Sequence, residues 1–173
     1  MIRHFTLLAE TTGRPVMLYN IPYRTGVNLG NEALLRLAAS PNIVGVKDCC
    51  ADAAQSFALL RDRPAGFSVL TGEDAWFHTA LTLGADGGIL ASAHIRTRDF
   101  ASVAAMLKAG DLSGALTVWR GLSDLTRLLF AEPNPAPIKH WLWRTGLIDS
   151  PELRLPMTGV SGELAARIDR AAA

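Results

Sequence analysis

Cysteine is scarce in this 173-residue sequence, which has only two, side by side at Cys49 and Cys50. Two adjacent cysteines cannot build the framework of spaced disulfides that stabilises small secreted domains. The sequence therefore predicts a chain that folds in a reducing, cytoplasmic setting. We interpret both cysteines as small apolar side chains that fill space at the end of a strand, and not as reactive thiols.

Long apolar runs and an excess of one sign of charge are lacking too. No stretch approaches the roughly 18 apolar residues that span a membrane. Residues 1–13 do not combine an apolar block with a small-residue cleavage site, so we expect no signal peptide. Basic and acidic residues are interspersed and give a net charge of only +1, without the basic patch that nucleic-acid binding needs. We therefore expect small-molecule partners, and neither a membrane nor a nucleic acid.

Metal ligands and nucleotide-binding motifs are equally scarce. The four histidines lack the spacing of metal ligands, and they are His4, His78, His94 and His140. The sequence contains no P-loop, no dinucleotide-binding glycine fingerprint and no nucleophile elbow. We therefore expect no metal and no other cofactor.

What the sequence does contain is a regular alternation of short apolar runs with helical patterns. Strands are predicted where β-branched residues or glycines cluster, over residues 16–19, 43–47, 67–70 and 87–91. Helices are predicted before and between them, over residues 2–12, 32–39, 53–61 and 75–83. Such an alternation is typical of an α/β fold in which parallel strands are joined by right-handed crossovers.

The end of the sequence has a different pattern. From Asp99 onward we expect helices only, including a last helix over residues 163–172 that Ser161 caps. We therefore predict two parts, a half-barrel of four βα units over residues 1–110 and a helical appendage over residues 111–173.

The most informative residue is Lys47, at the end of the second predicted strand. It is one of only three lysines, and the other two, Lys108 and Lys139, lie in predicted helices. A lysine at the end of a buried strand loses hydration, which favours the neutral amine that attacks carbonyl carbons. The alternative is structural, with the aliphatic stem packed on the sheet and the ammonium group in water.

Read together, the strand ends resemble one known family. The segments are YNIPYRTG (19–26), GVKD (45–48), TGED (71–74), GADGGILAS (84–92), NPAPIK (134–139) and LRLP (153–156). In this order they resemble the dihydrodipicolinate synthase and N-acetylneuraminate lyase family, class I aldolases that act on pyruvate. The most specific signal is YNIPYRTG followed about twenty residues later by GVK, because the other segments are weak on their own.

This resemblance implies a fold. Members of the family are (β/α)8 TIM barrels with active sites at the carboxyl ends of their strands, and such a barrel takes about 250 residues. Only four strands are visible here, and they match the family's last four. We therefore expect an incomplete (β/α)8 TIM barrel, made of the last four βα units and followed by C-terminal helices. The family's glycine-threonine-threonine loop, which holds the pyruvate carboxylate, belongs to the part that is missing.

The resemblance also implies roles for four residues. Lys47 matches the lysine that forms a Schiff base with the keto carbon of pyruvate, and Tyr19 matches a tyrosine that relays protons. Arg24 matches the arginine that binds a carboxylate of the second substrate, and Ile89 matches the residue near the pyruvate methyl group. The structural alternatives are a core tyrosine, a loop-ordering arginine and a core isoleucine. We interpret Thr71–Asp74 as the cap of the next helix.

As a function, the resemblance implies a lyase similar to 4-hydroxy-tetrahydrodipicolinate synthase, which condenses pyruvate with an aldehyde such as aspartate semialdehyde. A 2-keto-3-deoxy sugar acid or N-acetylneuraminate aldolase stays open, although the arginine of YNIPYRTG favours the synthase branch. The other alternative is a non-catalytic half-barrel that serves as an assembly module. Because half a barrel leaves sheet edges open and inward-facing side chains exposed, we expect a homo-oligomer.

Overall fold

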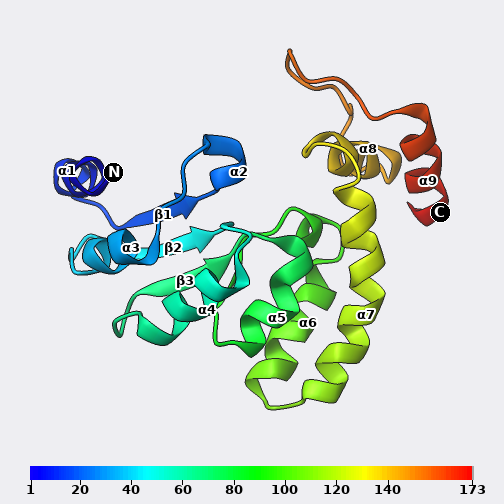
Figure 1. The fold of residues 1–173 in the computed structure, drawn as a ribbon. Coiled ribbons are helices and arrows are strands. Elements are labelled where there is room, and N and C mark those ends of the chain that lie inside the picture. Colours follow the sequence, from blue (N-terminus) through cyan, green and yellow to red (C-terminus); the bar gives the residue numbers. More distant parts are fainter. Residues whose placement is uncertain (173) are drawn as a thin grey trace. The chain divides into compact units, whose positions relative to one another are not determined.

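The structure of this chain is a computed structural model that describes residues 1–172. It divides into two compact units, one over residues 1–89 and one from residue 90 onward (Figure 1). The division predicted at residue 110 concerns folding domains and stays a prediction.

The first unit is built on a four-stranded sheet in the order β1-β2-β3-β4. Its strands are β1 (Val16–Asn20), β2 (Ile43–Asp48), β3 (Ser68–Thr71) and β4 (Gly87–Gly88). Every neighbouring pair is parallel, which confirms the predicted α/β class and strand alternation. The strand β4 is shorter than predicted, because two glycines bring no side chains that would pack and extend it.

The helices of this unit lie before and between the strands, as predicted apart from α2. They are α1 (Ile2–Thr12), α2 (Pro22–Thr25), α3 (Asn31–Ala38), α4 (Ala53–Asp62), the 3-10 turn η1 (Asp74–Trp76) and α5 (Phe77–Thr82). Helix α1 ends where Gly13 adopts a left-handed conformation with φ of 58°, which glycine tolerates best. The short helix α2 was not predicted, and it begins with Pro22, whose fixed φ suits the first helical position.

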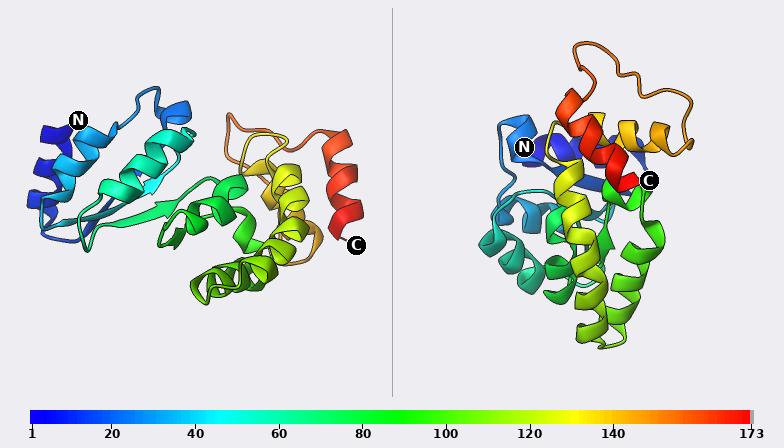
Figure 2. Two further views of the ribbon diagram at one scale, coloured as in Figure 1. Left: turned by 60° about the horizontal axis from the view of Figure 1, so that its bottom comes forward. Right: turned by 90° about the vertical axis from the view of Figure 1, so that its right-hand side faces the viewer.

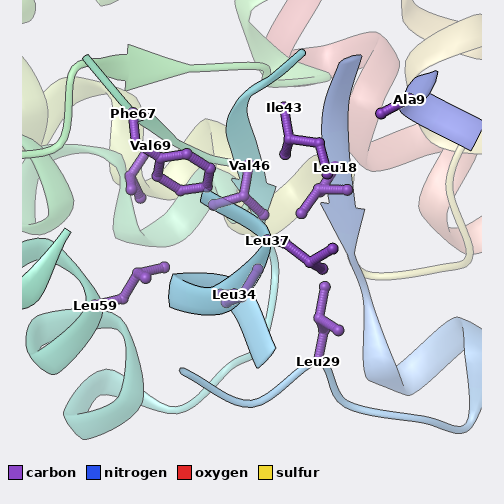
Figure 3. Packing of buried hydrophobic residues seen from close by; sticks show 10 residues of the cluster. All are labelled: Ala9, Leu18, Leu29, Leu34, Leu37, Ile43, Val46, Leu59, Phe67 and Val69. Carbon is purple, nitrogen blue, oxygen red and sulfur yellow. The ribbon is translucent and has the colours of Figure 1, made fainter. Parts of the chain in front are cut away.

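Helices α1, α3 and α4 lie together along one face of the sheet (Figure 2). Apolar side chains of these helices, of the strands and of the adjoining loops form one core (Figure 3), which consists of Ala9, Leu18, Leu29, Leu34, Leu37, Ile43, Val46, Leu59, Phe67 and Val69. The other face of the sheet is far more open, since Met17, Tyr19 and Ile89 are 38%, 48% and 46% exposed. Because side chains alternate along a strand, one face of this sheet is a packed core and the other is accessible.

The second unit is helical, as predicted. It consists of the 3-10 turn η2 (Ser92–His94) and the helices α6 (Thr97–Lys108), α7 (Leu112–Leu129), α8 (Ala136–Arg144) and α9 (Gly162–Ala172). Leu129, Trp141, Leu164 and Ile168 form a buried cluster between α7, α8 and α9. The hydroxyl of Ser161 accepts a hydrogen bond of 3.2 Å from the Leu164 amide, which confirms the predicted cap. Within residues 1–172, no helix combines the length and the apolar character needed to cross a membrane.

Candidate functional site

The carboxyl ends of all four strands meet at one edge of the sheet, because the strands are parallel. Backbone hydrogen bonds continue past the last paired residues, from the Cys49 amide to the Asn20 carbonyl and from the Gly72 amide to the Asp48 carbonyl, both at 2.8 Å. A third bond of 2.9 Å runs from the Ile89 amide to the Thr71 carbonyl. The backbone along this edge is therefore continuously hydrogen-bonded, which fixes the positions of the alpha carbons from which its side chains project.

Tyr19 and Lys47 meet at this edge. They are register partners in β1 and β2, so their side chains leave the sheet on the same face, the open one. The Lys47 amine donates a hydrogen bond of 3.1 Å to the Tyr19 hydroxyl oxygen and lies 4.1 Å from the centre of the phenol ring. An amine and a phenol in direct contact can exchange a proton, which is what imine chemistry requires of them.

Lys47 is only partly buried, because it projects from the open face. The expected loss of hydration is thus incomplete in this chain. The part of Lys47 that is closely packed is its aliphatic stem, which lies against Gly72. A Cβ at Gly72 would lie 2.5 Å from the Lys47 Cε and would overlap the Cys49 sulfur. Gly72 therefore leaves the space through which the lysine side chain reaches the phenol.

Cys49 is the nearest thiol and is 1% exposed. Burial, with a smaller contribution from the Glu73 carboxylate, raises the pKa of Cys49 to about 12 although the Lys47 amine opposes the shift. Burial also raises the pKa of Cys50. Both thiols are thus protonated at neutral pH, which supports the interpretation of the cysteines as space-filling side chains.

Arg24 and Ile89 lie at the same end of the sheet. Arg24 is in α2, directly after β1, and its side chain is exposed. Ile89 is 46% exposed and is therefore not a core residue. Two residues before it, Gly87 pairs with Leu70, which is itself next to Lys47 across the sheet, so alternation places Ile89 on the face of Lys47. The roles of both residues stay predictions.

Neither Gly72 nor Glu73 was predicted as a site residue. The segment Thr71–Asp74 was expected to cap a helix, but η1 has no side-chain cap, and the Thr71 hydroxyl accepts a 3.2 Å bond from the Glu73 amide instead. The Glu73 carboxylate lies near the phenol of Tyr23, whose pKa is raised by burial first and by this carboxylate second. A glycine directly after the strand next to Lys47 was the available signal.

The unit also contains a cavity of about 40 Å³ that does not include the Lys47–Tyr19 contact. Its lining includes Asp48, Cys50 and Ser56 and not Lys47. Among residues 1–172, no group of three or more His, Cys, Asp or Glu side chains is arranged to hold a metal ion.

Comparisons with known proteins identify the relatives of this chain. The sequence model described as the Dihydrodipicolinate synthetase family matches residues 1–172. The 4-hydroxy-tetrahydrodipicolinate synthase 2 of Clostridium acetobutylicum is 48% identical over 167 residues, which cover 96% of this chain and 58% of that protein. The synthase of Laribacter hongkongensis is 38% identical over 99% of this chain and 58% of its own length.

Solved structures give the same result for the fold. The dihydrodipicolinate synthase of Aquifex aeolicus superimposes with a TM-score of 0.94 at 30% identity, over 98% of this chain and 58% of that chain. The chloride-inhibited enzyme of Acinetobacter baumannii, in complex with pyruvate, superimposes with a TM-score of 0.93 at 37% identity, over 99% and 58%.

The chain thus spans little more than half the length of the relatives it matches. Together with the parallel four-stranded sheet, these matches confirm the predicted fold, the C-terminal part of a TIM barrel. The sequence resemblance is likewise confirmed, and the chain belongs to the dihydrodipicolinate synthetase family.

Proposed function

We propose that this chain carries the imine-forming part of a pyruvate-dependent lyase site of the 4-hydroxy-tetrahydrodipicolinate synthase type. The observation that carries the proposal is the 3.1 Å contact between the Lys47 amine and the Tyr19 hydroxyl at the carboxyl ends of neighbouring parallel strands. Active sites of TIM barrels lie at that end of the strands. The named activity of the relatives and the pyruvate in the Acinetobacter baumannii structure support the same chemistry.

In the proposed reaction, the Lys47 amine attacks the keto carbon of pyruvate, a carbon–nitrogen bond forms and water leaves. The protonated imine draws electrons from the pyruvate methyl group, which loses a proton and becomes the nucleophilic carbon of an enamine. That carbon then forms a bond to the carbonyl carbon of an aldehyde such as aspartate semialdehyde, whose oxygen takes up a proton and becomes a hydroxyl group. Cleavage of the carbon–nitrogen bond to Lys47 then releases the product and restores the free amine. Tyr19 passes protons to and from the nitrogen and the oxygen during these steps.

Two further side chains complete the proposal. Arg24, exposed in α2 directly after β1, binds a carboxylate of the aldehyde substrate through its planar guanidinium group. Ile89, on the face of Lys47, packs against the pyruvate methyl group. The guanidinium favours an acidic aldehyde, and hence the synthase branch, over the sugar acid and N-acetylneuraminate aldolases.

The open face of the sheet favours assembly as a second part of the function. Met17, Tyr19 and Ile89 expose apolar surface there, and β1 and β4 are edge strands. Exposed apolar surface next to open edges is a protein-interaction surface. We propose that the chain works as a homo-oligomer in the cytoplasm and that association covers this face. Light scattering tests this, and a monomer with cooperative unfolding contradicts it.

Exchange of the pyruvate methyl protons in D2O tests the catalytic proposal and separates it from a non-catalytic assembly module. Formation of an imine and then an enamine replaces methyl hydrogens by deuterium, so the methyl signal in the proton NMR spectrum of pyruvate decays with time. We expect decay with the unaltered chain and none with Lys47→Ala. Equal background decay with both proteins contradicts the catalytic proposal and leaves the assembly module.

A further inference from the structure

Directly after Tyr19 and Lys47 comes a second pair of register partners, Asn20 in β1 and Asp48 in β2. Alternation turns these two side chains to the helix-covered face of the sheet, opposite to Tyr19 and Lys47. Both are buried, with 2% and 6% exposed surface. Buried polar side chains are costly unless each of their groups has a partner, so their hydrogen bonds indicate what they hold in place.

The amide group of Asn20 connects the end of β1 to the loop that follows α2. Its nitrogen donates to the Asn28 side-chain oxygen at 3.0 Å and to the Leu29 carbonyl at 3.4 Å. Its oxygen accepts a bond of 3.0 Å from the Leu29 amide. The same nitrogen donates across the sheet to the Asp48 carboxylate at 3.4 Å. Asn20, the residue next to Tyr19, is thereby held both to the loop after α2 and to β2.

The carboxylate of Asp48 connects the end of β2 to α4. One oxygen accepts a short bond of 2.6 Å from the Ser56 hydroxyl and a longer one of 3.5 Å from the Cys50 thiol. The other accepts from the Cys50 amide at 3.2 Å and from Asn20. Every neighbour donates, and a carboxylate is the side chain that only accepts. Asp48, the residue next to Lys47, is therefore held in place by these bonds.

We propose that Asn20 and Asp48 are positioning residues for the Lys47–Tyr19 pair, and this inference rests on the function proposed above. They touch neither substrate nor the reacting atoms. Their hydrogen bonds on the helix-covered face hold the last residues of β1 and β2. This fixes the orientation of both strand ends, and with it the contact between the Lys47 amine and the Tyr19 phenol. Supporting bonds of this kind matter because productive geometry tolerates errors of only about 0.5 Å and 10–20°.

Asp48→Asn is the sharpest variant, because it keeps the shape of the side chain but puts a donor among donors. The control is Asn42→Ala in the same unit. It removes the bond of 3.2 Å that Asn42 donates to the Ala9 carbonyl at the opposite ends of the strands. Asp48→Asn disturbs buried polar contacts and Asn42→Ala removes a partly buried one, but only Asp48→Asn acts at the carboxyl edge. Should Asp48→Asn fail to fold, Ser56→Ala tests the same contacts, because it removes the 2.6 Å bond to Asp48 together with the 3.2 Å contact between the Ser56 hydroxyl and the Cys50 sulfur.

Two readouts on the full chain decide the proposal. The first is the nuclear Overhauser contact between the Lys47 side chain and the Tyr19 ring, which needs no substrate. The second is the rate at which cyanoborohydride traps pyruvate on Lys47, measured as a function of pH. For Asp48→Asn we expect a weakened Overhauser contact and trapping that is slower by about 10- to 100-fold with an altered pH profile. For Asn42→Ala we expect both readouts to stay unchanged.

The proposal is overturned if Asp48→Asn keeps the Overhauser contact and traps pyruvate like the unaltered chain. It is also overturned if Asn42→Ala loses both to the same extent, because general destabilisation then explains the effect. If the unaltered chain traps no pyruvate at all, the proposed function fails, and the Overhauser contact alone still decides whether Asn20 and Asp48 position the pair.

Discussion

Gly72 and Lys47 share a space that only one side chain can occupy. The alpha carbon of Gly72 faces the lysine stem so closely that an added Cβ would lie 2.5 Å from the Lys47 Cε. Real Cβ atoms do not approach other carbons to that distance, so any side chain at residue 72 must displace the lysine, the neighbouring Cys49, or both.

The first prediction is that Gly72→Ala lowers the rate of pyruvate trapping on Lys47 while the chain still folds. Overpacking costs about 1–3 kcal/mol in the free energy of unfolding. The overlap with the sulfur of the buried Cys49 is tighter than that with the flexible lysine end, so we expect a cost toward the upper end of that range. The amine then leaves the Tyr19 hydroxyl, so we expect trapping of pyruvate on Lys47 to fall by about 10-fold or more. Urea unfolding and reductive trapping measure the two effects.

Gly30→Ala is the matched control, because a Cβ at that residue meets no atom within 4 Å. We expect this variant to keep the trapping rate and to lose only about 0.5–1 kcal/mol of stability, because Gly30 is the N-cap of α3 and alanine caps less well. If Gly72→Ala traps pyruvate as fast as Gly30→Ala, the close packing around the lysine has no part in the chemistry.

The second prediction concerns alkaline pH. The pKa of Cys49 rises from 9.0 to about 12 on folding, mainly through burial. Above pH 9 the unfolded chain therefore releases a proton that the folded chain keeps, so the free energy of unfolding decreases as the pH rises. The raised pKa values of Cys50 and Tyr23 act in the same direction.

We expect Cys49→Ala to lose part of this alkaline decrease, measured by urea unfolding under reducing conditions at neutral pH and at about pH 10. In the folded chain, both thiols should react slowly with iodoacetamide at neutral pH. Rapid alkylation of Cys49 without unfolding contradicts the burial that the prediction rests on.

The strands could be predicted where β-branched residues cluster, because short apolar runs that alternate with helical segments are typical of buried parallel strands. Lys47 could be placed at the end of β2 for the same reason. Its partial exposure could not be predicted, since that depends on what covers the open face and not on the local sequence. Gly72 was missed for a similar reason: the overlap of a Cβ with the lysine stem exists only between strands that are distant in sequence.

The third prediction concerns acid pH. Burial acts to raise the pKa of Asp86, but hydrogen bonds from Arg63 and from the Val69 amide outweigh it and lower the pKa below the ordinary 3.8. The stabilisation from this carboxylate is thus fully present above about pH 4 and is lost as the pH falls through the lowered value. We expect Asp86→Asn to lower the free energy of unfolding at neutral pH by about 0.5–1 kcal/mol, because a partly exposed ion pair is screened.

The acid-dependent part should be missing in Asp86→Asn, so its stability should change less between neutral and acid pH than that of the unaltered chain. Asp62→Asn is the control, since Asp62 pairs only with its exposed neighbour Arg61. We expect no measurable change from it. Equal effects of the two variants would show that the contacts of Asp86 with Arg63 and Val69 add nothing.

The central claim is that the Lys47 amine captures a keto acid, and peptide mapping after treatment with pyruvate and borohydride tests it most directly. The chain has only two other lysines, Lys108 and Lys139, which serve as internal controls in the same digest. We predict that the reduced pyruvate adduct appears on the Lys47 peptide and on neither of the others. An unlabelled Lys47 peptide, under conditions in which a full-length relative is labelled, contradicts the account.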